Sequence, residues 1–453
     1  MRARMRGRAA ARGRAWGPPA LPGGPLGALR AWRRDPLGLL RRAAALGDVV
    51  RVPLPRFEAW LLNHPDHVHE VLVAGHRSFA KGPTMQAAKL VLGEGLLTSE
   101  GERHRRQRRL IQPIFHPDRV LRAAGTVVAH AERAAGRWRA GEVLDVHAEM
   151  ARLALSVAAE SLFAADVEAG EAEAIGRALT EQLAGFGRIF SPLFPLTLRL
   201  PLPANRRLGE ARALLDRTVE RMIRERRAAG ARGEDALSLL VAAREEGLPG
   251  MTDRQVRDEA MTLLLAGHET TAVALTWTWH LLARHPEAEA RLHDELDRVL
   301  GGRPPAASDL PRLAWAADVV RESMRLFPPA WAIGRRALRD HPVGPWTVPA
   351  GTVVVVSPYL LHRDPRWWPE PEAFRPERWA GEDPSRPRLA YLPFGAGPRM
   401  CVGEPFAWVE ATLVLAAIAR RWRLRPAPGR PVAVRPAVTL RPHGGVWMVA
   451  EPR

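Results

Sequence analysis

The chain of 453 residues contains a single cysteine, and the residues around it are typical of a reactive sulfur rather than of a packed core position. Cys401 lies in a glycine-rich stretch, residues 394–403, and Pro405 then marks the start of a long apolar helix expected over Phe406 to Arg425. Unpaired amides at a helix start stabilise negative charge on a nearby sulfur. An inert buried cysteine is the plain alternative. A thiolate without cysteines or histidines at zinc spacing favours single-sulfur ligation of haem iron.

A second chemical group is expected at the centre of a long helix. Thr252 and Gln255 form a capping box, and the helix that they begin is predicted to end at His285-Pro286, after about 30 residues. Its middle reads Ala266-Gly267-His268-Glu269-Thr270-Thr271. The plain alternative is an ordinary core helix, in which Gly267 would lower helix stability by about 1 kcal/mol relative to alanine. An acid and two hydroxyls are costly to bury without partners, however, and threonine can bond back one turn and bend a helix.

The cysteine stretch resembles a known family signature. Residues 394–403 match Phe-x-x-Gly-x-Arg-x-Cys-x-Gly, the haem-binding signature of the cytochrome P-450 superfamily of haem-thiolate monooxygenases. The resemblance extends from about Leu21 to the C-terminus, with the motifs in the family's order. It implies a mainly α protein with a small β subdomain, in the triangular fold with a long central helix over the haem. It also implies that Cys401 ligates the iron of haem b, in a loop that contains Phe394, Gly397 and Gly403.

The helix-centre group resembles the oxygen-binding groove of the same family. On that resemblance Ala266 and Gly267 leave room for O2, while Thr270 and Glu269 are catalytic and deliver protons to it. Proton relay needs a hydroxyl near the oxygen and an acid connected to solvent, which these two residues could supply. No role is assigned to His268.

Haem brings two propionates that need cations. The resemblance assigns them to four residues: His104, Arg108, Arg335 and Arg399. Arginine suits this task because its guanidinium can form two hydrogen bonds to one carboxylate. In a chain so rich in arginine, any one of them is otherwise a solvated surface residue.

A charged pair on another helix is expected to be structural. Glu322 and Arg325 stand at i and i+3 in a helix predicted over Leu313 to Phe327, which alone indicates a routine surface pair. Residues 374–379 (FRPERW) resemble the family's partner motif, whose arginine, here Arg378, completes a buried triad. Losing one member would leave a buried charge unpaired. The segment from His362 to Pro365 also matches the family and is interpreted as structural.

The remaining pattern predicts a helical chain with little sheet. Residues 49–62 read as a strand pair broken at Pro53 and Pro55. Residues 68–300 are overwhelmingly helical, with breaks at residues 192–203 and 247–250, and a capping box at Ser99 to Glu102 predicts a helix containing His104 to Ile111. Short strands are expected after Pro342, notably over residues 352–357 and 438–449. Residues 1–14 are expected to form a disordered basic arm, and residues 15–453 a single catalytic domain.

Composition excludes several classes of protein. The formal net charge is +18, and arginine supplies all but two of the 67 basic residues, Lys81 and Lys89. The preference for arginine over lysine is typical of a GC-rich coding sequence. With only two tyrosines, the chain lacks the aromatic residues that alternate with basic ones on a nucleic-acid-binding surface, so nucleic-acid binding is not expected. No apolar run is long enough to span a membrane, and no hydrophobic segment follows the basic start. With one cysteine, the chain is predicted to be cytoplasmic.

Electrons are expected from a separate protein, since the chain ends about 50 residues past the cysteine with no flavin domain; peroxide use is the alternative. Basic residues are predicted over the sulfur side, on the helix of His104 and at the end of the late helix: Arg103, Arg105, Arg106, Arg108, Arg109, Arg420, Arg421, Arg423 and Arg425. Such a patch would attract an acidic donor, a ferredoxin or flavodoxin with its reductase.

The substrate is predicted to be a long apolar molecule, because the segments expected to line the distal pocket are apolar: residues 85–97, 183–200, 263–266 and 330–333. Several short sequence segments, among them residues 326–331 and 439–442, resemble those of a thermophile β-carotene hydroxylase subfamily. Fatty-acid hydroxylases share some of these segments. Carotenoids, fatty acids and terpenoid-like compounds therefore stay open. The rival hypotheses are a haem-thiolate isomerase, dehydratase or gas sensor, and a helical binding protein without haem.

Overall fold

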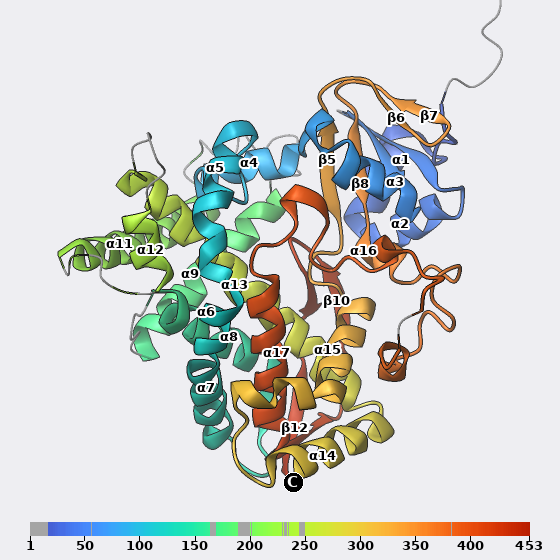
Figure 1. Ribbon diagram of the computed structural model, residues 1–453. Coiled ribbons are helices and arrows are strands. Elements are labelled where there is room, and N and C mark those ends of the chain that lie inside the picture. Colours follow the sequence, from blue (N-terminus) through green and yellow to red (C-terminus); the bar gives the residue numbers. More distant parts are fainter. Residues whose placement is uncertain are drawn as a thin grey trace, which may run out of the picture.

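In the computed structural model the described part of the chain is mainly helical, with four small sheets (Figure 1). The structure describes residues 17–453 except 56, 164–168, 189–199, 201, 229, 231–232, 234, 244–249 and 382. The expected basic arm, most of the expected breaks at residues 192–203 and 247–250, and most of the stretch 183–200 lie outside the described residues.

Helices supply most of the described chain. The α-helices are α1 (Gly24–Arg34), α2 (Pro36–Ala44), α3 (Pro65–His69), α4 (Pro83–Leu92), α5 (Gly101–Ile111), α6 (Pro117–Arg122), α7 (Ala124–Arg137), α8 (Val146–Phe163), α9 (Ala169–Arg188), α11 (Pro203–Ala228), α12 (Ala236–Ala242), α13 (Asp253–Leu282), α14 (Pro286–Leu300), α15 (Ala314–Leu326), α16 (Pro358–Leu361) and α17 (Glu404–Ala419). Single turns that matter below are η1 (Glu70–Ala74) and η7 (Gly397–Arg399).

The strands form one mixed sheet and three smaller antiparallel ones. They are β1 (Val49–Leu54), β2 (Phe57–Leu62), β3 (Phe79–Lys81), β4 (Val143–Asp145), β5 (Ile333–Ala337), β6 (His341–Val343), β7 (Trp346–Val348), β8 (Val353–Val356), β9 (Trp422–Pro426), β10 (Ala433–Pro436), β11 (Leu440–His443) and β12 (Trp447–Pro452). The larger sheet has the order β1-β2-β8-β5-β3, and the others are β10-β11, β4-β12-β9 and β6-β7. The predicted strand pair over 49–62 is confirmed, with Val49 opposite Leu62.

The long central helix is confirmed. Thr252 caps α13 by accepting a hydrogen bond from the Gln255 amide, and the Gln255 side chain bonds back to the Thr252 amide. The helix has 30 residues, and 23 of them are buried, so it passes through the core rather than over it. Figure 1 shows the sheet of β5 and β8 with α1, α2 and α3 on one side of the molecule, and α8, α9, α11 and α12 on the other.

Two local predictions are wrong. The late helix, α17, ends at Ala419, because the chain then enters β9 and pairs with β12 at the C-terminus. The expected capping box at Ser99 does not form: Glu100 is the N-cap residue of α5 and makes no side-chain cap. Among the described residues, no helix combines the length and the apolar character that a bilayer crossing requires.

Candidate active site

The cysteine loop is held by its own backbone and by close packing. The Cys401 amide donates to the carbonyl oxygen of Phe394 at 2.9 Å, which closes the loop. The Phe394 ring lies edge-on to Trp408, with 5.4 Å between the ring centroids. Gly397 has a φ of +70°, and a Cβ there would collide with the carbonyl oxygen of Leu72 in η1. Both the backbone conformation and the contact therefore require glycine at 397.

The Cys401 sulfur lies in a recess. Its side chain is exposed, yet burial raises the pKa of the thiol, so protein surrounds the sulfur on most sides and leaves one side open. Backbone hydrogen bonds from Gly403 and Glu404 at the start of α17, with the charge of Arg108, oppose that rise. The expected helix-start amides are present, but burial outweighs them. Iron deprotonates a thiol that coordinates it. A Cβ at Gly403 would make only ordinary contacts, 3.5 Å from the Phe115 ring.

Basic side chains from four segments gather beside this loop. They are Lys81 on β3, His104 and Arg108 on α5, Arg335 on β5 and Arg399 in η7. Lys81 stands opposite Arg335 in the sheet register. Arg399 forms an ion pair with Glu100, and Arg108 donates to the carbonyl oxygen of Met400 beside the cysteine. The structure thus brings together all four predicted propionate residues, and it adds Lys81 and Glu100.

This cluster carries more positive charge than its carboxylates balance. Burial and the charges of Lys81 and Arg399 lower the pKa of His104 to about 4. Burial, opposed by Glu100 but reinforced by Arg399 and Arg335, lowers the pKa of Lys81 to about 7. Burial and Arg399 lower the pKa of Arg335 to about 10. A ligand with two carboxylates would relieve this surplus, which is why these residues fit haem.

One residue in the middle of α13 is exposed although the residues before it are buried. Leu263, Leu264 and Leu265 are buried, whereas Ala266, the next residue of this interior helix, is exposed. Thr270 donates its hydroxyl to the Ala266 carbonyl oxygen at 2.6 Å, the expected bond to the preceding turn. Space on this side of α13 is what the predicted groove requires.

Gly267 serves a different contact from Ala266. A Cβ at Gly267 would lie 3.5 Å from the Cβ of Ala158 on α8, which is ordinary packing distance. Gly267 therefore lies where α13 packs against α8. His268 is buried, and burial lowers the pKa of its imidazole to about 4. It is therefore held uncharged at neutral pH.

Glu269 is buried and held from outside its own helix. Its Oε1 accepts a hydrogen bond from the Thr439 hydroxyl at 2.7 Å and from Arg441 Nε at 3.1 Å. Arg441 also forms an ion pair with it through a second nitrogen. Thr439 and Arg441 come from the β10–β11 hairpin, 170 residues or more along the chain. Sequence reasoning missed both, because a single sequence gives no signal for that pairing.

The Glu322 triad is assembled as its motifs imply. Glu322 and Arg325 are fully buried and joined by hydrogen bonds of 2.8 and 3.0 Å. Arg378 Nε donates to Glu322 at 2.9 Å, and the indole nitrogen of Trp379 donates at 3.0 Å. The carboxylate thereby ties α15 to the segment that leads to the cysteine loop.

A histidine continues that connection to the loop. Arg325 donates to the His362 carbonyl oxygen at 2.8 Å, and the Leu392 amide donates to His362 Nε2 at 2.9 Å. Leu392 precedes Phe394 by two residues. His362 accepts this bond as a neutral ring, since burial lowers the pKa of its imidazole to about 3. Its placement agrees with the structural interpretation of the segment His362 to Pro365.

The stretch between α4 and α5 is fastened to α13, which the sequence did not reveal. The amides of Glu94 and Leu96 donate to Asp258 and Glu259, each at 2.8 Å. Lys81 Nζ donates to the carbonyl oxygens of Leu96 and Ser99 at 2.7 and 2.9 Å. The composition gave one hint that Lys81 has a particular role, because it is one of only two lysines in a chain whose other basic residues are arginines.

The predicted basic patch over the sulfur is only partly assembled. Arg103 and Arg105 on α5 form ion pairs with Glu94 and Glu102. The second group of arginines, Arg420 to Arg425, follows the far end of α17, and a helix of 16 residues is about 24 Å long. There Arg420 and Arg425 form ion pairs with Glu132 and Glu289, both at 2.7 Å. That half of the predicted patch does not lie beside Cys401.

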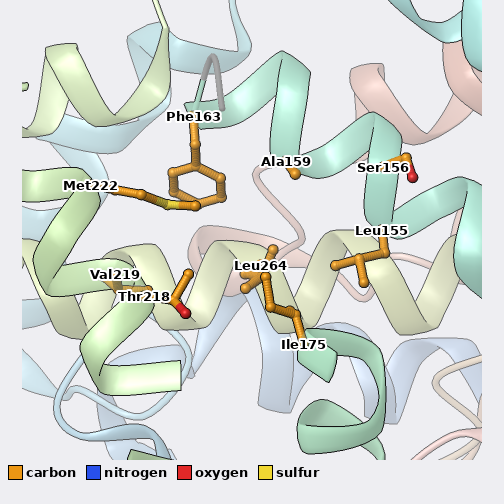
Figure 2. Close-up of a pocket in the computed structure, with 9 residues that line it drawn as sticks. All are labelled: Leu155, Ser156, Ala159, Phe163, Ile175, Thr218, Val219, Met222 and Leu264. Carbon is orange, nitrogen blue, oxygen red and sulfur yellow. The ribbon is translucent and has the colours of Figure 1, made fainter. Parts of the chain in front are cut away.

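A small, largely apolar cavity lies elsewhere, between α13 and the helices α8, α9 and α11 (Figure 2). It has room for about one water-sized sphere, about 10 Å³. Its lining comes from α8, α9, α11 and α13: Leu155, Ser156, Ala159, Phe163, Ile175, Thr218, Val219, Met222 and Leu264. None of the predicted site residues lines it, although Leu264 belongs to a segment expected at the distal pocket.

Comparisons with known proteins agree with this geometry. The family model described as Cytochrome P-450 matches residues 34–446. Cyclooctatin synthase of Streptomyces melanosporofaciens is 43% identical, over 97% of both chains. Cyclooctat-9-en-7-ol 5-monooxygenase of the same organism is 41% identical, over 93% of this chain and 92% of that one. Pentalenene oxygenase of Streptomyces avermitilis is 36% identical, over 89% of this chain and 91% of that one.

Proposed function

This chain belongs to the cytochrome P-450 family as a haem b-dependent monooxygenase, and we propose that its substrate is a cyclic terpenoid. One observation carries the proposal: the chain is more than 40% identical, nearly end to end, to two bacterial relatives. The name of one denotes oxygenation of cyclooctat-9-en-7-ol, a cyclic terpenoid alcohol. Carotenoids and fatty acids, also considered from the sequence, are the competing substrates.

Two exposed apolar residues, Leu97 and Ala266, support an apolar substrate. Leu97 is exposed although its neighbours Leu96 and Thr98 are buried, so its side chain is left facing open space. Its segment is fastened to α13 through Asp258 and Glu259, and α13 carries the exposed Ala266. Ligand pockets of this kind are mostly apolar with few polar groups.

We assign the site residues as follows. Cys401 ligates the haem iron, and His104, Arg108, Arg335 and Arg399 bind the propionates. When bound, the haem supplies the oxidation that inserts one atom of O2 into a C–H bond and reduces the other to water. The protein holds the substrate, and Thr270 and Glu269 hold and pass protons at the Thr270 hydroxyl and the Glu269 carboxylate.

Electrons are proposed to come from a separate acidic donor, a ferredoxin or flavodoxin with its reductase. The arginines of α5 support this proposal, because α5 also carries His104 and Arg108 and therefore lies beside the cysteine loop. Opposite charge speeds the encounter of such partners and makes it dependent on salt. The single cysteine supports a cytoplasmic location.

Turnover with a defined set of substrates tests the proposal. Haem-loaded protein is mixed with NADPH, ferredoxin, ferredoxin reductase and ¹⁸O2, and offered a cyclic terpenoid, a carotenoid or a fatty acid. We expect a substrate-dependent absorption shift and one ¹⁸O atom incorporated with the terpenoid. Oxygenation of only the fatty acid or the carotenoid would overturn the terpenoid assignment. Binding without any oxygenated product would favour a haem-thiolate protein that does not activate oxygen.

A further inference from the structure

The outer face of α1 presents an exposed leucine among arginines. Leu26, Arg30, Arg33 and Arg34 stand at i, i+4, i+7 and i+8, and therefore share one face of the helix. Leu26 is 77% exposed, the highest value among the large apolar residues of the described chain. Ala28, on the inner face, is buried. The same residues, with Leu29, line a shallow hollow in the surface; these five residues are called the α1 patch.

The charges of the α1 patch are not balanced locally. Within the part of the chain that the structure describes, Arg30, Arg33 and Arg34 form no ion pair with a carboxylate. The only acidic residue from α1 to the end of α2 is Asp35, and it accepts a hydrogen bond from the Gly38 amide at 2.8 Å. The next helix adds Arg42 and, just after it, Leu46, both exposed.

The excess charge is concentrated in this part of the chain. Residues 1–46 contain eleven arginines and one acid, so about a tenth of the sequence carries more than half of the net charge of +18. General arginine use does not explain this. On α11 the arginines alternate with acids (Glu210, Asp216, Glu220 and Glu225), and several of them form ion pairs: Arg207, Arg212, Arg221, Arg226 and Arg227.

We propose that the α1 patch docks on an anionic phospholipid bilayer. An amphipathic basic helix with apolar side chains lies in the plane of a membrane surface, its arginines on the lipid phosphates and its leucines between the headgroups. Charge complementarity selects anionic lipid. Docking places the enzyme where apolar compounds dissolve, but it requires neither the terpenoid assignment nor turnover.

Vesicle binding tests the proposal with the haem-loaded, full-length protein. The probes are vesicles of phosphatidylcholine alone and of phosphatidylcholine with 30% phosphatidylglycerol, and bound protein is measured by sedimentation. We expect binding to the anionic vesicles only, weakening as salt is raised. Arg30→Gln, Arg33→Gln and Arg34→Gln combined should weaken it about a hundredfold, at about fivefold per arginine. Leu26→Ser should weaken it at high salt as well as at low salt.

A matched variant separates this patch from general charge. Arg206→Gln, Arg217→Gln and Arg224→Gln remove the same charge from exposed positions of α11. We expect vesicle binding close to that of the parent protein and an unchanged carbon monoxide spectrum in every variant. Equal losses in the two triple variants, or equal binding to neutral vesicles, would overturn the proposal. So would binding of a DNA oligonucleotide without vesicle binding, or self-association that the α1 changes abolish.

Discussion

At the scale of single residues, the structure places the sulfur of Cys401 in a recess that is open on one side, beside a surplus of positive charge. Haem ligation by this sulfur is the assignment on which the other roles depend. Cys401→Ala should abolish the red-shifted band of the reduced carbon monoxide complex, because no other thiol exists in the chain. The measurement is a difference spectrum of haem-supplied protein.

Val402→Ala is the matched control for that change, since it alters the same loop and keeps the sulfur. It should retain the band. A folded Cys401→Ala variant with the parental spectrum would refute the ligand assignment.

Arg441 and Thr439 give the proposed proton carrier, Glu269, an anchor outside α13. Arg441→Gln should lower the product formed per NADPH severalfold and raise peroxide release, because the carboxylate loses the partner that positions it. Substrate affinity, read from the absorption shift, should change little. A single positioned acid or base contributes roughly 10²–10⁴-fold to a rate.

Two further variants decide whether position or packing is responsible. Arg441→Lys keeps the charge and should recover part of the coupling. Arg435→Gln, directly opposite Arg441 in the hairpin, removes an exposed charge and should leave coupling intact. Unaltered coupling in Arg441→Gln would show that Glu269 needs no such anchor.

At the scale of elements, the buried Glu322 carboxylate joins α15 to the segment before the cysteine loop. Glu322→Gln leaves the Arg325 and Arg378 guanidiniums facing a neutral amide in the interior. Breaking a buried pair in this way costs about 3–5 kcal/mol of unfolding free energy. Urea unfolding, followed by circular dichroism, measures the loss.

Glu377→Gln is the control, because Glu377 pairs with Arg291 at 2.8 Å on the surface. Exposed pairs are worth about 0–1 kcal/mol, so its unfolding curve should nearly match that of the parent. An equal loss of unfolding free energy in the two variants would mean that the Glu322 triad does not stabilise the fold.

Which elements the sequence predicts depends on the range of the interactions that form them. The Thr252 cap was predictable because Gln255 lies three residues away and both partners act locally. The box predicted between Ser99 and Glu102 fails because the N-cap position is taken by Glu100, whose carboxylate binds Arg399 and the Lys81 amide, both distant in sequence. Glu102 accepts a hydrogen bond from Arg105 instead. The end of α17 was predicted too late for the same reason. Residues 422–426 form a strand because they pair with residues 448–452, which are distant in sequence.

The candidate site divides in the same way. Cys401, Thr270 and the Glu322 pair stand in short motifs, so they could be named without a structure. Lys81, Arg441 and the amide contacts of Glu259 belong to no motif. They join the site because segments distant in sequence meet in the fold, 163 residues apart for the Leu96–Glu259 contact and 172 for the Arg441–Glu269 contact.

At the scale of the whole molecule, a buried acid makes stability depend on pH. Glu410 on α17 is buried, accepts a hydrogen bond from the Thr271 hydroxyl at 3.1 Å, and has its pKa raised to about 8 by burial. Between pH 4.5 and 8 the folded chain keeps this proton and the unfolded chain releases it. Stability therefore falls as pH rises through this window, by up to about 1.4 kcal/mol per pH unit from this group.

Glu410→Gln removes that dependence, because an amide does not titrate and can still accept from Thr271. Relative to the parent, the variant should gain stability steadily from pH 5 to pH 8 in urea unfolding. Glu287→Gln, an exposed change on α14, should show no such trend. A constant difference across that range would mean that Glu410 is ionised in the folded protein.

The crowded cations beside the cysteine loop bear on how the enzyme matures. Lys81, Arg335 and Arg399 repel one another, and on the proposed assignment the two haem propionates would relieve that repulsion, so the free energy of haem binding would add to the free energy of folding. Iron and porphyrin biosynthesis in the producing cell would then set how much active enzyme accumulates. Chains synthesised faster than haem is supplied would stay less stable and would be degraded by proteases.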